Sequence, residues 1–379
     1  MQFSTSIFRH LAMIFTLAVC TLSIFYNVAS ATTVLDASTR QPLPKASIFD
    51  YKGNFIAVTD NNGVIPSTVS KSAFPINIRY VGYNPVDVEN PAVETVELEE
   101  AIYTLPEITI DDKSRNMLDL TAYVREYGSG TTDTDSIIQY SEQIVDFMLP
   151  RTKKAKFKGW KDARVLAERS YREKITNGKD TFTYHENDKG RGFGFKYMDK
   201  YILPDAIAAG NSISETIMGK HFPKEEWKVR GDHYYLRKDE LADKKDHKIS
   251  PVFAKMLGMT MDFNTQEYTY VFDGNKDGRK IDKEFTAEDV TSASGTWEIV
   301  FSGKVTKWAF ESKEPVIFNH YAEVFIIDRA YLTADEAREL KKNPPIVSMQ
   351  FKAPENIPPA VPAMAELKAK VIEAVPKAH

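Results

Sequence analysis

The sequence contains a single cysteine, Cys20, in a chain of 379 residues. Because Cys20 lies in a segment that we expect to be removed, a disulfide framework, a cysteine-ligated zinc site and a cysteine nucleophile are excluded. The chain also lacks an excess of one charge: 49 lysines and arginines stand against 53 aspartates and glutamates, a formal charge of −4. This balance excludes a nucleic-acid binder that works through bulk charge.

Long apolar runs are confined to the N-terminal end of the chain. The run Leu11–Phe25 carries no charge, and Ala29-Ser30-Ala31 provides an A-x-A cleavage site. Together they predict a secretory signal peptide over residues 1–31. The uncharged run is short for a transmembrane helix, which needs about 20 apolar residues. No later stretch approaches that length, so we expect no transmembrane segment after cleavage.

A lipoprotein leader is the alternative, because Leu17-Ala18-Val19-Cys20 forms a weak lipobox. Val19 is larger than the residue expected before a lipidated cysteine, so the sequence favours ordinary cleavage before Thr32. A secreted protein without cysteine suits a bacterial periplasm or outer membrane better than a eukaryotic secretion route. We therefore expect export across the inner membrane.

Residues 32–110 alternate short apolar strands with turns. In the segments Ile76–Tyr80 and Val96–Glu99, apolar and polar residues alternate, as in strands with one buried face. Asn61-Asn62-Gly63 is a strong turn signal. Six or seven strands of this kind predict a small β-sandwich with Greek-key connections.

Four motifs follow one another in this region: Val34-Leu35-Asp36, Pro42-Leu43-Pro44-x-Ala46-x-Ile48, Thr59-Asp60-x-x-Gly63 and Tyr80-Val81-Gly82-Tyr83. They resemble the carboxypeptidase regulatory-like domain, a transthyretin-like β-sandwich that is common in Bacteroidetes envelope proteins. The resemblance implies a domain without catalytic residues. Thr32, Arg40 and Lys45 occupy positions that are usually glycine in that family, and Ile65 one that is usually aromatic. Glycine tolerates positive φ at such places, so these turns are expected to be reshaped.

Residues 116–351 predict a curved antiparallel sheet with a few helices, so that the fold class is mainly β (α+β). The expected strands are Ile137–Leu149, Tyr268–Phe272, Trp297–Phe301 and Val316–Ile327, with a hairpin at Asn177-Gly178. The expected helices are Asn116–Tyr127, Asp205–Met218 and Thr333–Lys342, the last with a capping box. Part of this region loosely resembles half-barrel domains of the same envelope proteins. Residues 352–379 form a tail rich in Pro, Ala and Lys, with a loose helix over Pro362–Val375.

One candidate metal site has the spacing of a calcium loop: Asp273-x-Asn275-x-Asp277-Gly278, with Glu284 at the twelfth position. Oxygen ligands at these positions suit a hard cation. However, a strand precedes the loop where a helix is required, and Lys280 and Ile281 do not match the pattern. The sequence favours a polar β-turn here over a calcium site.

His320-x-x-Glu323 has the spacing of a zinc signature, but on a strand these two side chains face opposite sides. A third ligand is missing downstream, and neither His185-Glu186 nor His233 has a partner at ligand spacing. No Gly-x-Ser-x-Gly element is present. We therefore assign no catalytic, cofactor-binding or metal-ligating residue, and we expect no cofactor.

Two further segments have ordinary interpretations. The basic, aromatic run Arg151–Lys161 is interpreted as a solvated loop and not as a nucleic-acid site. The glycine-rich run Lys189–Phe195 lacks the spacing of a phosphate-binding loop.

The expected function is that of a non-catalytic binding or assembly factor in the envelope. Its partner is an envelope protein or an apolar, peptide or glycan ligand, held in an apolar groove that too few helices cover. An enzyme acting on an envelope glycan or peptide is the alternative, and a structural surface protein is a third possibility.

Overall fold

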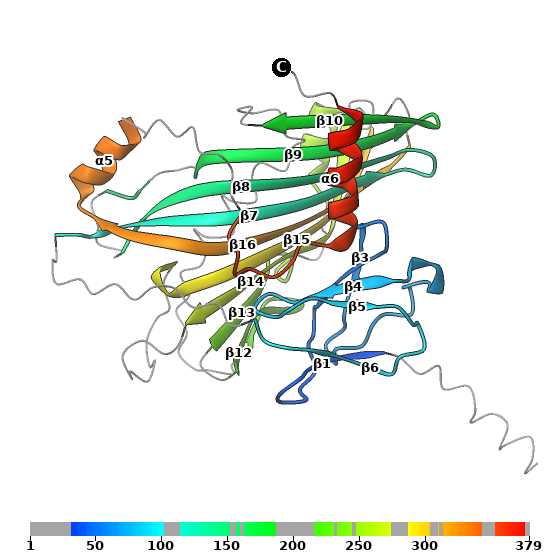
Figure 1. Cartoon of the computed structure of the whole chain (residues 1–379), viewed down its shortest axis with the longest axis horizontal. Coiled ribbons are helices and arrows are strands. Elements are labelled where there is room, and N and C mark those ends of the chain that lie inside the picture. Colours follow the sequence, from blue (N-terminus) through cyan, green and yellow to red (C-terminus); the bar gives the residue numbers. More distant parts are fainter. Residues whose placement is uncertain are drawn as a thin grey trace, which may run out of the picture.

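The computed structural model describes residues 32–101, 114–151, 157–159, 163–186, 216–230, 233–244, 248–273, 287–303, 310, 314–342 and 353–375. Over these residues the protein is mainly β, as the sequence predicts. A body of short strands lies against one large sheet, and the C-terminal helix crosses that sheet (Figure 1).

Short strands build the N-terminal body, which we call the sandwich (residues 32–101). They are β1 (Thr33–Asp36), β2 (Ser47–Phe49), β3 (Phe55–Val58), β4 (Ile76–Arg79), β5 (Val86–Val88) and β6 (Thr95–Leu98), with the 3₁₀ turn η2 (Lys71–Ala73) before β4. β1 and β6 pair in parallel, and the other four form an antiparallel sheet in the order β3-β2-β4-β5. Buried side chains of both sheets, among them Val34, Ile48 and Leu98, share one core.

Two turns of the sandwich hold a backbone conformation that usually requires glycine. Arg40 has a φ of 60° and Lys45 a φ of 63°. The left-handed region costs a residue with a Cβ about 1–2 kcal/mol. Arg40 and Lys45, which occupy positions expected to be glycine, therefore both adopt the left-handed conformation.

Ten strands form a single antiparallel sheet. They are β7 (Met117–Thr131), β8 (Ser136–Pro150), β9 (Arg164–Thr176), β10 (Lys179–Glu186), β11 (Thr216–Met218), β12 (Pro223–Arg230), β13 (His233–Asp239), β14 (Met259–Asp273), β15 (Val290–Gly303) and β16 (Val316–Leu332). Their order is β10-β9-β8-β7-β16-β15-β14-β13-β12-β11. The predicted strands correspond to β8, β14, β15 and β16, and the predicted hairpin at Asn177-Gly178 joins β9 to β10.

Two predicted helices are wrong over the described residues. Asn116–Tyr127 lies largely in β7, which pairs with β8 on one side and β16 on the other. Both faces of β7 are buried, so its apolar residues do not alternate cleanly with polar ones and mimic a helical pattern. Asp205–Met218 is described only over its end, where Thr216–Met218 forms the edge strand β11.

The described helices are short. They are α3 (Pro251–Leu257), α5 (Ala334–Lys342) and α6 (Pro362–Ala374), together with the 3₁₀ turn η3 (Ala287–Asp289). The predicted capping box of α5 is present, because the Glu336 carboxylate accepts from the Thr333 N–H at 2.7 Å and the Thr333 hydroxyl accepts from the Glu336 N–H at 3.2 Å. No helix among the described residues is long and apolar enough to cross a membrane.

The two faces of the large sheet differ in what covers them. The docking face, which carries Tyr127, Tyr321 and Glu323, meets the sandwich and α6 (Figure 1). The opposite face, which we call the apolar face, carries Leu120, Tyr270 and Val324.

The apolar face does not form the open groove that the sequence predicts. Leu120, Tyr270 and Val324 are each 0% exposed. Large rings also pack over this face, since Trp227 of β12 stacks on Phe272 of β14, two strands away, with 5.7 Å between ring centroids. The described cavities lie instead between the sandwich and the docking face.

Candidate functional site at the domain junction

The sandwich rests on the part of the docking face where β15 carries small polar side chains. Ser292, Ser294 and Thr296 point to this side, in line with Phe325, Glu323 and Tyr321 of the neighbouring β16. Small side chains let the two bodies approach closely. At one such contact Gly82 has a φ of 82°, and a Cβ there would lie 2.9 Å from the Tyr235 hydroxyl.

A buried charge cluster joins the two bodies at the centre of this junction. Arg79 of β4 donates from Nε and Nη2 to the two carboxylate oxygens of Glu323, at 2.9 and 3.1 Å. Arg125 of β7 reaches the same carboxylate at 2.8 Å. The phenol groups of Tyr127 and Tyr321 also donate to it, at 3.1 and 3.3 Å.

The segment before α6 completes this cluster. The Arg125 guanidinium donates to the Pro358 carbonyl, and Arg79 donates to the Pro359 carbonyl, both at 2.8 Å. The sandwich, the large sheet and the segment before α6, which are distant in sequence, therefore meet around the carboxylate of Glu323. The bidentate pairing of Arg79 with Glu323 has the geometry of the stronger charge-assisted hydrogen bonds.

The protonation of the cluster follows from its charges. Burial alone would raise the pKa of Glu323, but the positive charges of Arg125 and Arg79 outweigh burial and lower this pKa below its usual value. Burial would also lower the pKa of each arginine, and the charge of Glu323 raises both instead. The three groups are therefore ionised at neutral pH.

A second contact lies toward the other end of the junction, around Arg230 of β12. Its guanidinium lies 5.4–5.8 Å from the ring centroids of Tyr80, Tyr83 and Tyr235, a distance at which cation–π attraction applies. Arg230 also lies 3.4 Å from the carboxylate of Asp36, which accepts from the Tyr83 hydroxyl at 2.6 Å. The sandwich thus supplies both the anion and most of the ring faces.

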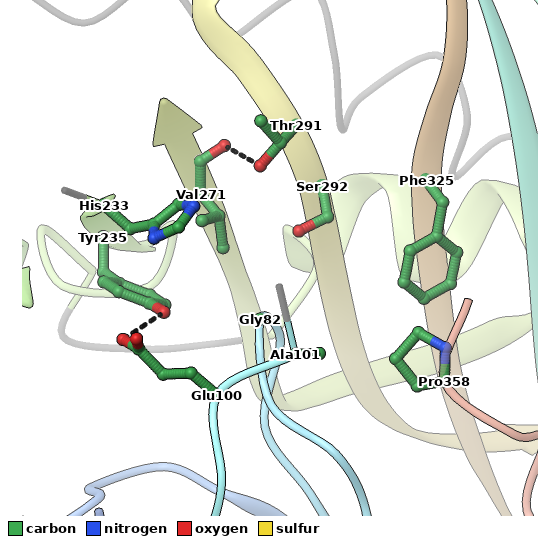
Figure 2. A pocket seen from close by; sticks show the side chains of 10 residues that line it. All are labelled: Gly82, Glu100, Ala101, His233, Tyr235, Val271, Thr291, Ser292, Phe325 and Pro358. Carbon is green, nitrogen blue, oxygen red and sulfur yellow. Dashed lines mark hydrogen bonds between the residues drawn. The ribbon is translucent and has the colours of Figure 1, made fainter. Parts of the chain in front are cut away.

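A small cavity opens where the sandwich, the sheet and the segment before α6 meet (Figure 2). Its volume is about 20 Å³, enough for one water molecule. Figure 2 shows Glu100 and Tyr235 on one side, joined by a hydrogen bond of 3.4 Å, and Phe325 with Pro358 on the other. The imidazole of His233 lies beside Tyr235.

Two side-chain hydroxyls that line this cavity donate hydrogen bonds. The hydroxyl of Tyr235 donates to Glu100, and the hydroxyl of Thr291 donates to the Val271 carbonyl at 3.3 Å. Neither bond joins a hydroxyl nucleophile to the His233 imidazole, which is the pairing that nucleophilic catalysis requires. The carboxylate of Glu100 retains acceptor capacity for a hydroxyl or an ammonium group.

A second cavity of about 20 Å³ lies beside the charge cluster. It is lined by residues of the sandwich and of strands β14 to β16, among them Lys45, Arg79, Glu267 and Thr296. Its polar lining and size fit one ordered water molecule.

The structure separates the residues of the zinc-like signature, as expected. Glu323 belongs to the charge cluster on the docking face, whereas His320 is buried on the side of Ala322 and Val324. Burial lowers the pKa of His320 to about 3, so the ring is neutral. Within the described part of the chain, no three His, Cys, Asp or Glu side chains form a group that could hold a metal ion.

The other sequence candidates have separate locations. Of the calcium-like loop only Asp273, the last residue of β14, is described, and Glu284 lies outside the described residues. His185 lies on the edge strand β10, and His233 lines the cavity of Figure 2. The glycine-rich run Lys189–Phe195 lies outside the described residues. In the basic run, Arg151 bonds Glu288 at 3.1 Å and lies 4.6 Å from the Tyr331 ring centroid.

An acidic group with a perturbed pKa lies apart from the junction. Burial raises the pKa of Asp119 in β7 to about 7; the negative charges of Asp146 and Asp328 add to this effect and Arg164 opposes it. An acid with a raised folded-state pKa stabilises the fold below its unfolded pKa, and this contribution is lost as the pH rises through the folded pKa. Asp119 therefore contributes more to the stability of the folded state below about pH 4 than at pH 7 and above.

Sequence reasoning did not single out Arg79 or Arg125. Arg79 alternates with the apolar residues Ile76 and Ile78, so the sequence places it on the polar face of its strand. A signal was available for Arg125, which lies on the same strand face as Tyr123 and Tyr127. A charge in such a place is buried only when it is paired.

Comparisons with known proteins do not identify a family. No family model matches the chain, and no curated protein matches it. Among solved structures, a lipovitellin structure described as "Lipid-protein interactions in lipovitellin" is similar with a TM-score of 0.27 and 8% sequence identity, over 58% of this chain and 26% of that one. The matched part is about a quarter of the lipovitellin chain, and similarity at this level carries no argument about fold or function.

Proposed function

We propose that this protein is a non-catalytic binding or assembly factor, exported across the inner membrane to the periplasm or the outer membrane of a Bacteroidetes-type envelope. Its partner is an envelope protein or an apolar, peptide or glycan ligand. The signal-peptide pattern of residues 1–31 and the resemblance of residues 32–110 to the carboxypeptidase regulatory-like domain support this location. The left-handed φ of Arg40 and Lys45, at positions where that family usually has glycine, is consistent with the resemblance.

The observation that carries the proposal is that the buried charges at the junction contact one another across the two bodies. Arg79 and Arg125 both contact the carboxylate of Glu323, and the pair of Arg79 with Glu323 joins the sandwich to the sheet. Buried charges that contact one another in this way favour one fixed orientation of two bodies. A fixed orientation of two β bodies is the property that a binding or assembly factor needs.

The alternative function, an enzyme acting on an envelope glycan or peptide, has one specific location in this fold. The cavity of Figure 2 brings the carboxylate of Glu100 near the phenol of Tyr235, and His233 lies beside them. These are the residue types of general acid–base chemistry. The two functions are therefore distinguished by substitutions at this cavity.

The experiment uses the mature chain with a crosslinker, captured from the native envelope. We expect one partner to be recovered repeatedly, and recovery to be unchanged in Glu100→Gln and His233→Ala. Glu97→Gln, in the same sandwich and 43% exposed, is the matched control. Turnover of an envelope glycan or peptide by the purified protein, lost in Glu100→Gln or His233→Ala but kept in Glu97→Gln, would contradict the proposal and establish the enzyme.

A further inference from the structure

Helix α3 presents an apolar face to the solvent. Val252, Phe253, Met256 and Leu257 are 77%, 57%, 69% and 46% exposed. Residues four apart on a helix lie one above the other, so these four side chains share one face. No residue of α3 is buried, which means that packing on the sheet does not explain why these side chains are apolar.

Capping residues at both ends stabilise this helix, and packing against a core does not. Ser250 caps the N-terminus, since its hydroxyl accepts from the Phe253 N–H at 3.4 Å, and Pro251 occupies the first turn. Gly258 closes the C-terminus with a φ of 64°, and its N–H bonds the Ala254 carbonyl. An isolated helix of seven residues is unstable in water. The sequence thus supplies both caps to a helix whose apolar face points outward.

The size of this face indicates what covers it. A standard protein–protein interface uses about 20–30 residues a side, and α3 offers four large apolar side chains. A lipid bilayer, in contrast, is bound at the level of its headgroups by the apolar face of a single helix, together with electrostatic attraction to anionic lipids. The area of the face therefore fits a bilayer better than a second protein or a second copy of this chain.

Charge near the helix supports the same occupant. Lys255 is exposed within α3, and the side chain of Lys248 is 63% exposed just before it. Lys248 faces Asp262 at 3.7 Å, in a pair so exposed that solvent screens it strongly. Lysines beside an apolar face attract the anionic headgroups of a membrane.

We propose that α3 is a bilayer-contact helix, in which Val252, Phe253, Met256 and Leu257 enter the headgroup boundary of an anionic membrane while Lys248 and Lys255 approach lipid phosphates. This surface lies at the start of β14, whereas Val271, which lines the cavity of Figure 2, lies near the end of that strand. The inference is therefore independent of the proposed function.

The experiment is sedimentation of the purified mature protein with vesicles of phosphatidylglycerol and phosphatidylcholine. We expect the protein to sediment with these vesicles, and the Phe253→Glu variant to show at least a tenfold loss of binding. Ile372→Glu is the matched control, because Ile372 is also an apolar helix residue, 52% exposed, on α6. This control should bind as the wild type does. Lys255→Glu should weaken binding to the anionic vesicles more than to vesicles of phosphatidylcholine alone.

Three results would overturn the inference. The first is that the wild-type protein does not sediment with either kind of vesicle. The second is that Phe253→Glu and Ile372→Glu weaken binding equally. The third is a wild-type dimer in size-exclusion chromatography that Phe253→Glu converts to a monomer, which would assign the face to a second copy of the chain. Because Phe253 is exposed, the thermal unfolding of Phe253→Glu should match the wild type, and this measurement confirms that the variant is folded.

Discussion

Replacing Glu323 by glutamine tests whether the charge cluster holds the sandwich on the sheet. The side chains of Arg79 and Arg125 are each 2% exposed, and that of Glu323 is 6% exposed. With Glu323 ionised, one negative charge lies between two positive charges. Glu323→Gln keeps the shape of the side chain and leaves both guanidinium groups buried without a counter-charge.

The magnitude follows from the cost of breaking a buried ion pair. Removing one partner of such a pair typically destabilises a protein by about 3–5 kcal/mol. The total stability of a folded domain is about 5–15 kcal/mol, so Glu323→Gln should remove a large part of it. Guanidinium denaturation at pH 7, followed by far-UV circular dichroism and by tyrosine fluorescence, measures this loss.

Two variants make this result specific. Glu97→Gln removes an acid from the exposed pair with Arg40, and exposed pairs are worth about 0–1 kcal/mol. A triple change of Arg79→Met, Arg125→Met and Glu323→Leu removes all three charges together and should recover most of the lost stability. A Glu323→Gln protein within about 1 kcal/mol of the wild type would refute the reasoning, since the loss would then equal that of an exposed pair.

Three further predictions concern other parts of the chain. Because the pKa of Asp119 is raised to about 7, Asp119→Asn should stabilise the protein more at pH 8 than at pH 4; equal effects in denaturant titrations at both pH values would contradict this sign. N-terminal sequencing of the exported protein should begin at Thr32, whereas a lipid-modified Cys20 would establish the lipobox alternative. Melting with chelator and with millimolar calcium should coincide; a calcium-dependent rise of several degrees, abolished by Asp273→Ala, would restore the calcium-loop hypothesis.

The sequence predicts strands well where one face is buried, and less well elsewhere. Apolar and polar residues alternate in Tyr268–Phe272 of β14 and in Trp297–Phe301 of β15, whereas β16 is a long, largely apolar run; the sequence predicts all three strands. β12 and β13 were not predicted, because charged residues occupy much of their length. In the fold these charges pair between neighbouring strands, as when Arg237 of β13 bonds Glu226 of β12 at 2.5 Å and Glu267 of β14 at 2.6 Å.

The junction could not be predicted from local patterns. Arg79 and Glu323 are separated by 244 residues, and neither residue belongs to a sequence motif that predicts the other as its partner. The seven-residue helix α3 was also missed, since its length is below that at which a periodic apolar pattern is visible. What the sequence does indicate is a strand position where a charge interrupts an apolar series, and such a position implies a partner without identifying it.

The contact between Arg79 and the Pro359 carbonyl also joins groups that are synthesised at different times. The two groups lie 280 residues apart, which corresponds to roughly 15–60 s of translation at typical rates. Phe49 and Phe55, near the start of the chain, share a core with Met364 and Val371 of α6. The core that the sandwich shares with α6 is therefore complete only after α6, one of the last helices, has been synthesised. A chain cut short before α6 would leave that core open, which gives proteases a means of distinguishing truncated chains from full-length ones.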